Sequence, residues 1–428
     1  MRQSHQLPLV GLLLYSLIPS QLCKICEVHK ENYSCLNPLI RTMINSKHTR
    51  GIQDANVLLS FRLVGIQKQD VEQQLIQHIK DKVARKGSDL TSGQLALITL
   101  ALGECQNPDK KFIDDYHLVS QLEKKFQEEI ENMGAHNGKP LTNYYQLSLD
   151  VLALCLFNGS YSIPKVAELF DPENKNYYFG GQFSVDTGAM AVLALTCLEK
   201  NVTNGQIKID SKDLECIDNH IKSLVKKILS EKKENGLIGN IFSTGEAMQA
   251  LFVSSNYYNE SEWDCQQTLD TVLKEISHGT FSIPTAAAQI FPALIGKTYL
   301  DVNKDSPCSN NFNISTCESV TPTDSPSNIS VHYSVKINET YSTNVTVLNG
   351  SFFLDVMTEA QKINETIFSF TMVETSWGPY ITSVQGLSAN SSKRTYWQLL
   401  SEGKPLSQGA GSYLVHDGEN LEVRWSKY

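Results

Sequence analysis

The spacing of hydrophobic positions changes about three-quarters of the way along this chain. From about residue 24 to residue 304, apolar residues recur every three or four positions, as in Val71, Leu75 and Ile79. This spacing is typical of helices with one buried face. From Ile329 to Ile337 apolar and polar residues alternate, which is the pattern of a half-buried strand. The change of period predicts a helical domain followed by a domain of different architecture.

One pattern repeats within the helical part: a polar start, small residues, and then a run rich in Leu and Ala. The copies begin at Ser92, Tyr145, Ser184, Ser243 and Thr285. Their separations are roughly 40 to 60 residues, about the length of one helix pair. Six such pairs would fill the region and fit an α6/α6 barrel of inner and outer helices. Since crowding near an axis favours small side chains, we expect the Ala-rich helices inside, with their N-terminal ends along one rim.

The last hundred residues predict a small α+β domain that is mostly β. Residues 305–327 are rich in Ser, Pro, Thr and Asn and predict a linker. Residues 353–363 keep helical spacing, and Leu421, Val423 and Trp425 alternate in a final strand. Asn-Gly and Asp-Gly pairs supply turn signals. We therefore expect a helical domain over 24–304 and an α+β domain over 328–428.

The N-terminus has the features of a secretory signal peptide. Arg2 supplies positive charge, and Leu7–Ile18 form an apolar run too short to span a bilayer. We expect a signal over 1–23 with cleavage near Cys23. No other segment approaches transmembrane length, so the sequence predicts a secreted, extracellular, soluble protein.

Asn-x-Ser/Thr sequons are unusually numerous, and they support secretion. A few sequons occur in any chain, but eleven indicate a surface with much attached glycan. The predicted glycosylation sites are Asn32, Asn158, Asn201, Asn259, Asn313, Asn328, Asn338, Asn344, Asn349, Asn364 and Asn390.

The charge argues against some partners and sites. The net charge is −9 and the pI is about 5.6, so nucleic acid is not an expected partner.

Ten histidines occur without the HxxxH or HExxH spacing of zinc sites, and no bound metal is predicted. We expect a monomer.

The segment Ser184–Cys197 carries the most information. Ser184 and Asp186 are good N-cap residues, and strong core formers follow them. The whole segment resembles the signature of the vertebrate cobalamin (vitamin B12) carriers. Further blocks resemble that family in the same order: Thr142–Gln146 with Leu152–Cys155, Gly239–Asn240 with Ser243–Thr244, Ala286–Gln289, Ser376–Gly378 and Tyr396–Gln398. Among the members, the chain is most similar to the heavily glycosylated kind.

The resemblance also implies a disulfide pattern. Ten cysteines in a secreted chain indicate disulfides. The family's pattern implies the pairs Cys26–Cys265, Cys105–Cys308 and Cys155–Cys197. It leaves Cys35, Cys216 and Cys317 unassigned, together with Cys23 if that residue survives cleavage.

As function, the resemblance implies binding of cobalamin and other corrinoids between the two domains, for transport and protection. The ligand is a flat macrocycle fringed with amides, which needs hydrogen-bonding groups around it and apolar surface against the ring. From the helical rim the implied binding residues are Thr142, Asn143, Tyr144, Tyr145, Gln146, Gln182, Asp186, Asn240, Ser243 and Gln289. From the second domain they are Ser376, Trp377, Gly378, Pro379, Tyr380, Ile381, Tyr396, Trp397, Gln398, Leu399 and Leu406.

Gln182 stands where a family member has a histidine that can reach the cobalt. The substitution implies that an exogenous group such as water keeps the cobalt's upper position. A cell-surface or glycan receptor is a further partner that the resemblance implies.

Two alternatives remain open at this point. One is a family member of the kind that serves intestinal uptake of cobalamin, known as intrinsic factor. The other is a secreted α6/α6 glycan hydrolase, because that fold also carries glycosidases. Glycosidases need two carboxylates across one cleft, and Asp186 is the one carboxylate that these motifs place at the rim. We therefore expect a binding protein without enzymatic activity.

Overall fold

The structure is a computed structural model and describes most of the chain. The described residues are 26–44, 52–86, 89–103, 105, 113, 115–179, 181–302, 312, 328–348, 351–375, 378–390, 395–406, 409–411, 413 and 415–427. The predicted signal peptide and, apart from Phe312, the predicted linker lie outside them, so the domain boundaries stay predictions. The chain groups into two compact units, treated separately below: residues 1–34, 91–275 and 289–308, and residues 35–90, 276–288 and 309–428.

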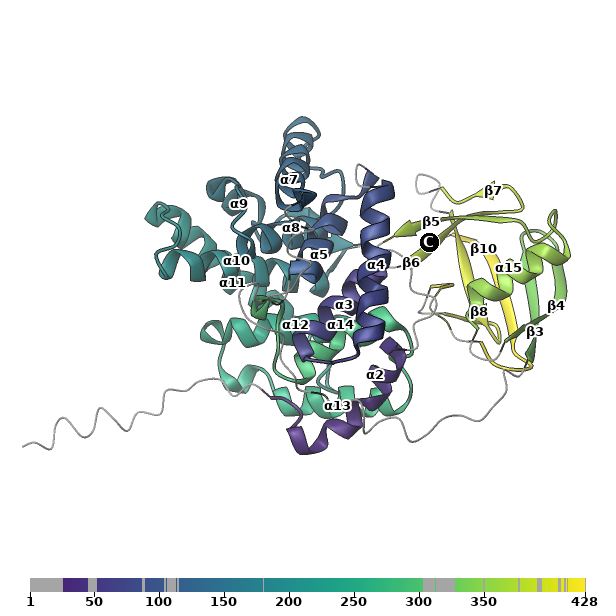
Figure 1. Ribbon diagram of the computed structural model, residues 1–428. Helices are drawn as coiled ribbons and strands as arrows, with labels where there is room; N and C mark the ends of the chain where they lie inside the picture. The colour runs from purple at the N-terminus through teal and green to yellow at the C-terminus, as the bar shows by residue number, and fades with distance from the viewer. Residues whose placement is uncertain are drawn as a thin grey trace, which may run out of the picture. The chain divides into compact units, whose positions relative to one another are not determined.

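The first unit is built from helices (Figure 1). Its complete α-helices are α5 (Ser92–Gly103), α7 (Leu118–Ala135), α8 (Tyr144–Leu156), α9 (Ile163–Leu169), α10 (Val185–Thr203), α11 (Ser211–Ser230) and α12 (Ser243–Val253). It also holds most of α13 (Cys265–Ser277) and the second half of α14 (Pro284–Leu294). The five repeats found in the sequence coincide with α5, α8, α10, α12 and α14.

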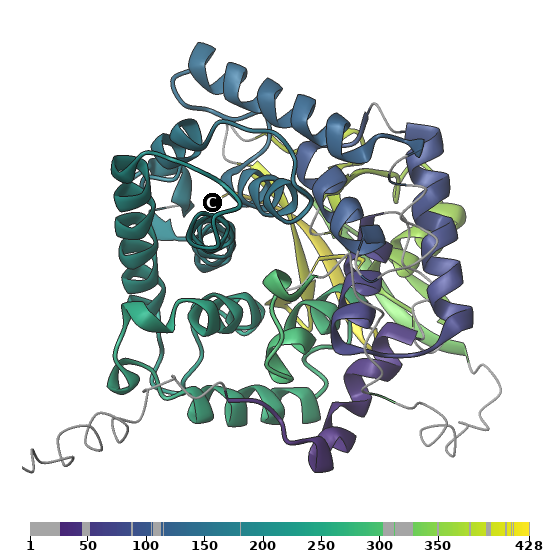
Figure 2. The same cartoon turned by 60° about the vertical axis from the view of Figure 1, so that its left-hand side comes forward.

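The repeat helices have the burial expected of inner helices. α10 begins with a run of fourteen residues in which all but Asp186 are buried, and it packs against α8, α11 and α12. Outer helices bury one stripe each: α11 buries Ile217, Ile221 and Leu224 and exposes charged residues on its other side. Figure 2 shows α8 and α10 nearly end-on, with α7 and α11 outside them.

Two glycines let inner helices approach closely. A Cβ on Gly93 of α5 would lie 2.6 Å from the Gln146 Cβ on α8. A Cβ on Gly245 of α12 would lie 3.0 Å from the Ile290 Cα on α14. Both contacts involve positions near the start of an inner helix, so small residues there are a packing requirement.

Disulfides fix this unit as the resemblance implied. Cys26–Cys265 ties the N-terminal segment to the start of α13, and Cys155–Cys197 ties α8 to α10. Cys105 is also disulfide-bonded. Its implied partner, Cys308, lies outside the described residues, so that pairing stays a prediction. Cys35 and Cys216 are free thiols.

The second unit contains both helices and sheets. Its first helices are α2 (Asn37–Ile44), α3 (Ile52–Val64) and α4 (Gln69–Lys86), and α3 packs against α4. An ion pair joins them, because the Arg62 Nε lies 2.9 Å from the Glu72 Oε1.

The C-terminal part of this unit forms two sheets. The first has the order β4 (Thr340–Leu348), β3 (Asn328–Lys336), β10 (Asn420–Lys427), β8 (Thr395–Ser401) and β9 (Lys404–Pro405). β3 and β10 are parallel, and the other neighbours are antiparallel. The second sheet has the order β5 (Phe370–Thr375), β6 (Gly378–Val384) and β7 (Leu387–Ser388).

The predicted elements of this part are confirmed. β3 buries Val331, Tyr333 and Val335 and exposes Ser330 and His332, as the alternation indicated. Helix α15 has the predicted bounds, Phe353–Ile363, and packs on β3 and β4 (Figure 1). The mainly helical chain with a small β-rich C-terminal part agrees with the predicted fold class.

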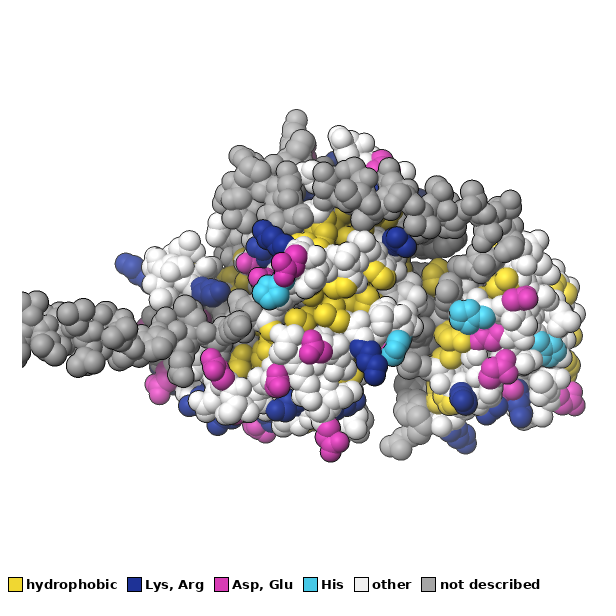
Figure 3. Space-filling model, turned by 90° about the horizontal axis from the view of Figure 1, so that it is seen from below, with side chains coloured by type: hydrophobic (Ala, Val, Ile, Leu, Met, Phe, Trp, Pro, Cys, Tyr) yellow, Lys and Arg dark blue, Asp and Glu magenta, His cyan; other side chains and the backbone are white. Residues whose placement is uncertain are grey.

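The surface has mixed charge and exposed sequons. On the face in Figure 3, acidic and basic side chains of the described residues are interspersed. The exposed sequon asparagines are Asn32, Asn158, Asn259, Asn328, Asn338, Asn344 and Asn390. Asn201 and Asn364 are half-buried, while Asn313 and Asn349 lie outside the described residues. Glycan occupancy stays a prediction.

Candidate functional site

The first candidate region is a polar rim at the start of three inner helices. We define the rim as Thr142–Gln146, Asp186, Asn240, Ser243 and Glu246. Side-chain caps fix these helix starts, since the Asn143 Oδ1 accepts a hydrogen bond from the Gln146 N (2.9 Å) and the Asn240 Oδ1 accepts one from the Ser243 N (2.9 Å). α10 begins in the same way, capped by Ser184. Because each cap satisfies free backbone N–H groups, these turns are well fixed.

The turns before α8 and α12 each place one amide group with a defined orientation. The Gln146 Oε1 accepts a hydrogen bond from the Thr91 Oγ1 at 2.7 Å. The Asn240 Oδ1 accepts from the backbone N–H groups of Phe242 and Ser243. Both carbonyl oxygens are therefore engaged by the protein, and the NH₂ groups of the two side chains are their hydrogen-bond donors.

Two carboxyl groups lie at the rim. The Ser243 hydroxyl donates to the Asp186 Oδ2 at 2.9 Å, and the Tyr145 hydroxyl donates to the Glu246 Oε1 at 2.7 Å. Glu246 is only 1% exposed, and its Oε2 has no hydrogen-bond partner among the described residues. The expectation of one rim carboxylate is therefore wrong, because the fold brings Glu246 of α12 to the rim.

Burial controls the protonation of this pair. Burial, reinforced by the charge of Asp186, raises the pKa of Glu246 to about 8. Burial also raises the pKa of Asp186, while the hydrogen bond from Ser243 acts in the opposite direction. Near neutral pH a neutral Glu246 therefore lies beside Asp186.

A third carboxyl supports the rim from behind. The Glu129 Oε2 accepts hydrogen bonds from the backbone N–H groups of Leu141 (2.7 Å) and Thr142 (3.2 Å). Its Oε1 accepts one from the Ser92 hydroxyl at 3.3 Å. Glu129 is 2% exposed, so it positions the segment before α8 without reaching solvent.

Tyr144, although it lies within the rim segment, and two further predicted residues have different surroundings. Tyr144 is 1% exposed, its ring stacks on Tyr177 at 5.3 Å, and its hydroxyl accepts from the Asn174 Nδ2. This burial favours a packing role over direct ligand contact. Gln182 is exposed in the short hairpin of β1 (Tyr178–Phe179) and β2 (Gln182–Phe183). Gln289 is half-buried on α14.

The second candidate region is a pocket of about 390 Å³ in the C-terminal part. Eight predicted residues line this C-terminal pocket: Pro379, Tyr380, Ile381, Tyr396, Trp397, Gln398, Leu399 and Leu406. Pro405, Gly409 and Ala410 complete its lining. Predicted Gly378 begins β6, whereas Ser376 and Trp377 lie outside the described residues. β6, β8 and the segment after β9 thus bring together residues that are distant in sequence.

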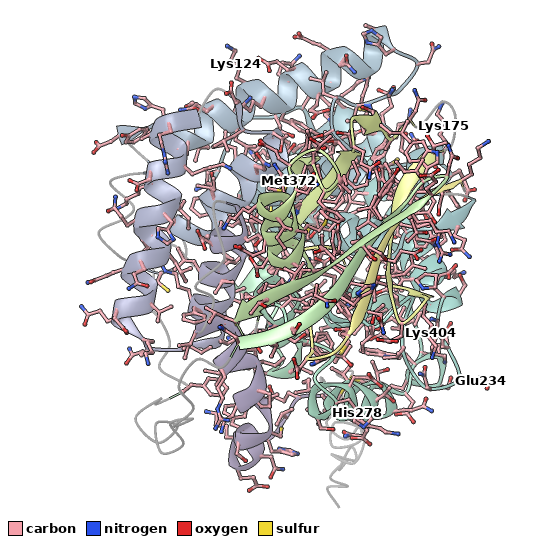
Figure 4. The ribbon with its side chains drawn as sticks, turned by 90° about the vertical axis from the view of Figure 1, so that its right-hand side faces the viewer. Lys124, Lys175, Glu234, His278, Met372 and Lys404 are labelled. Carbon is pink, nitrogen blue, oxygen red and sulfur yellow. A yellow bond between two sulfur atoms is a disulfide. The ribbon has the colours of Figure 1, made fainter. Side chains whose placement is uncertain are left out.

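Packing from below fixes the walls of the pocket. The Trp397 Nε1 donates to the Leu387 carbonyl at 3.1 Å, and its ring lies 4.8 Å from that of Trp425. Trp397 is 5% exposed and Tyr380 is 47% exposed. Tyr380 therefore offers far more aromatic surface to a ligand than Trp397 does. Lys404, labelled in Figure 4, lies on β9 next to the lining residue Pro405.

Glu246 is the main rim residue that the sequence interpretation missed. Ser243 and Glu246 are three residues apart at a helix start, which is the spacing of a capping box. That signal identifies a residue at the helix start. It does not show that the carboxyl contacts Tyr145 from α8, because that contact spans 101 residues of sequence.

The described residues lack two further features. They contain no cluster of three or more His, Cys, Asp or Glu side chains that could hold a metal ion. None of the helices within the described ranges has the length and apolar character needed to cross a membrane.

Comparisons with known proteins show to which family the chain belongs. Residues 8–328 match the family described as eukaryotic cobalamin-binding protein, and residues 350–427 match a domain of unknown function. Human transcobalamin-1 is 70% identical over the full length of both chains. Pig transcobalamin-1 is 53% identical over 96% of this chain and 98% of that protein. Human cobalamin binding intrinsic factor is 33% identical over 94% of each.

A solved structure supports the same conclusion. The crystal structure of haptocorrin in complex with Cbi has a TM-score of 0.78 and 67% identity to this chain, covering 95% of this chain and all of that one. This likeness confirms the predicted α6/α6 barrel with a small C-terminal domain. The family match covers well over half of the sequence. The chain therefore belongs to the family of eukaryotic cobalamin-binding proteins.

Proposed function

We propose that this protein is a secreted carrier of the haptocorrin (transcobalamin-1) type that binds cobalamin and other corrinoids. The observation that carries this proposal is the likeness, over nearly the whole chain, to a haptocorrin structure that holds Cbi. The identity to transcobalamin-1 is about twice that to intrinsic factor, which favours the first kind of carrier.

The two candidate regions suit different parts of a corrinoid. The amide side chains around the macrocycle need both donors and acceptors, and the rim supplies them from Gln146, Asn240, Ser243 and Tyr145. The C-terminal pocket offers apolar and aromatic surface, above all Tyr380. We further propose that one corrinoid uses both sets, with 305–327 as a linker between domains at 24–304 and 328–428.

Binding without catalysis fits the rim better than hydrolysis does. Asp186 and Glu246 form a pair of carboxyls, but Glu246 is 1% exposed and accepts from Tyr145. A general acid must reach the oxygen of the glycosidic bond, and a carboxyl this deeply buried does not. Failure to turn over a panel of glycans would support the carrier.

Several finer properties belong to the same proposal. Secretion follows from the expected signal peptide over 1–23, and glycosylation from the sequons. With the amide Gln182 on its hairpin, the cobalt would keep an exogenous upper ligand such as water. We also propose that the carrier is a monomer and that uptake uses a cell-surface or glycan receptor.

The decisive test is a spectroscopic titration of the secreted protein with aquocobalamin, followed by competition with cobinamide, which lacks the nucleotide tail. We expect binding near one to one and effective competition. Good cobalamin binding with poor competition would move the assignment toward an intrinsic-factor-like carrier for intestinal uptake. A folded protein that binds neither ligand would overturn the carrier proposal.

A further inference from the structure

We propose that Glu246 is a positioning residue that makes the rim select corrinoids with neutral carboxamide side chains over those with carboxylates. The inference rests on the proposed function, and it adds a specificity-determining residue. Four observations carry it: the direction of two hydroxyl protons, the orientation of two amides, the burial of Glu246, and the lack of a cation paired with either rim carboxyl.

The hydroxyl protons of the rim point at carboxyl groups. Tyr145 donates to Glu246 and Ser243 donates to Asp186. Each hydroxyl has one proton, so toward any other group these two oxygens act as acceptors. Once Glu246 is ionised, both carboxyl groups act only as acceptors and give the hydroxyls a fixed polarity.

The rim amides act as hydrogen-bond donors, whereas the hydroxyls act as acceptors. The carbonyl oxygens of Gln146 and Asn240 accept hydrogen bonds within the protein, which leaves NH₂ groups as donors. A carboxamide matches both kinds of group, because it has an NH₂ donor and a carbonyl acceptor. A carboxylate has acceptors only and leaves the hydroxyl oxygens unmatched.

Charge adds to this selection. No described Lys, Arg or His forms an ion pair with Asp186 or Glu246. Glu246 is also buried with its Oε2 unpartnered. Above about pH 8, where Glu246 is ionised, a ligand carboxylate brought to this place would meet like charge in a poorly solvated region, which disfavours its binding.

The titratable groups that act on Glu246 come from three elements. Asp186 lies on α10 and Tyr145 on α8. Tyr299, in the 3₁₀ turn η6 (Tyr299–Asp301), interacts electrostatically with Glu246. Burial raises the pKa of both tyrosines above its ordinary value, and Glu246, with a pKa of about 8, changes charge between pH 6 and pH 9.

The test compares cobalamin with cobalamin monocarboxylates, in which one peripheral carboxamide has been hydrolysed. Competition against cobalamin is measured at pH 8.5 for the wild type, Glu246→Gln and Glu234→Gln. Glu234 is an exposed carboxylate in the loop before α12, labelled in Figure 4, and controls for overall charge. We expect at least one isomer to bind the wild type tenfold more weakly than cobalamin. We expect Glu246→Gln to reduce that ratio at least threefold, and Glu234→Gln to leave it unchanged.

A second measurement needs no variant. The carboxylates of the ligands stay ionised from pH 6 to pH 9, so a larger discrimination ratio at pH 9 than at pH 6 supports the proposal. Equal ratios in the wild type and Glu246→Gln would overturn it, as would a ratio independent of pH in the wild type. Failure of the folded wild type to bind neutral cobalamin would instead overturn the proposed function. A merely structural role of Glu246 would change binding of neutral and charged ligands equally.

Discussion

The rim and the C-terminal pocket are built by different means. The rim lies at helix N-termini, where caps such as Asn143 and buried carboxyls such as Glu129 fix polar groups through hydrogen bonds. The pocket lies on paired strands, where Trp397 and Ile381 are fixed by burial in an apolar core. At the rim, hydrogen bonds specify the direction of each polar group. In the pocket, packing specifies the shape of the apolar surface.

The difference indicates which changes each region tolerates. A hydrogen-bonded carboxyl that loses its partner leaves a buried polar group unsatisfied, so conservative changes at the rim are costly. In the pocket an exposed aromatic contributes surface in proportion to its contact area. The predictions below test this contrast, beginning with the largest expected effect.

We expect the largest difference in stability between the two regions when a disulfide is removed. Cys155–Cys197 closes a loop of 42 residues within the first unit, and none of the described disulfides lies in the C-terminal part. Replacing both cysteines by Ala should lower the free energy of unfolding of the helical unit by about 4 kcal/mol. Hydrogen exchange should accelerate in α8 and α10 and stay unchanged in β3 and β10. Equal acceleration in both regions would show that they unfold together.

Glu246 should make the stability of the rim depend on pH. Its pKa is about 8, against 4.5 for the ordinary side chain. Because folding raises the pKa of the Glu246 carboxyl, its contribution to the free energy of unfolding is fully present below about pH 4.5. This contribution is lost as the pH rises through 8. The wild type should therefore lose up to about 1.4 kcal/mol per pH unit over that range relative to Glu246→Gln. Urea unfolding of both proteins from pH 5 to pH 9 measures the difference. Parallel curves would contradict it.

Substitutions of Asp186 and Tyr380 compare how much one side chain from each region contributes to cobalamin binding. Asp186→Ala removes the acceptor of the Ser243 hydroxyl and should weaken cobalamin binding by about 2 kcal/mol, roughly thirtyfold. Tyr380→Ala removes a half-exposed ring from the pocket and should cost about 1 kcal/mol. Dissociation rates of the two variants give both values. A larger loss for Tyr380→Ala would reverse the ranking of the regions.

We expect substitution of Trp397 to have the smallest effect on cobalamin binding. Trp397→Phe keeps an aromatic ring in the core but removes the hydrogen bond to the Leu387 carbonyl. We expect the C-terminal part to lose about 1 kcal/mol of stability and cobalamin affinity to change less than threefold. Near-ultraviolet circular dichroism during thermal unfolding reports the stability. A loss of affinity beyond tenfold would assign Trp397 a direct ligand contact.

Local patterns in the sequence predicted the elements well. Ser184 followed by a buried run predicted α10, and alternation predicted β3, because helix and strand periods are properties of consecutive residues. The C-terminal pocket collects eight residues that the resemblance had implied. Their type and order were readable from the chain, since each belongs to a short contiguous motif.

Burial and side-chain partners were less predictable. Tyr144 and Tyr145 are neighbours in sequence, yet Tyr144 packs on Tyr177 while Tyr145 reaches Glu246. Consecutive helix residues point about 100° apart, so neighbours in a motif face different surroundings. Which surroundings each one meets depends on helices far away in the chain.

The sequence by itself determined the helical repeats and the strands of the C-terminal part, which follow from local periodicity. Contiguous motifs gave the resemblance to a cobalamin-binding family, and that resemblance in turn implied the cysteine pairs that the structure describes. Only the tertiary structure decided that Glu246 lies beside Asp186, that Glu129 holds the segment before α8, and that Trp397 is mostly covered. Those facts depend on contacts across tens of residues, because protonation and exposure are set by three-dimensional surroundings and not by neighbours in the chain.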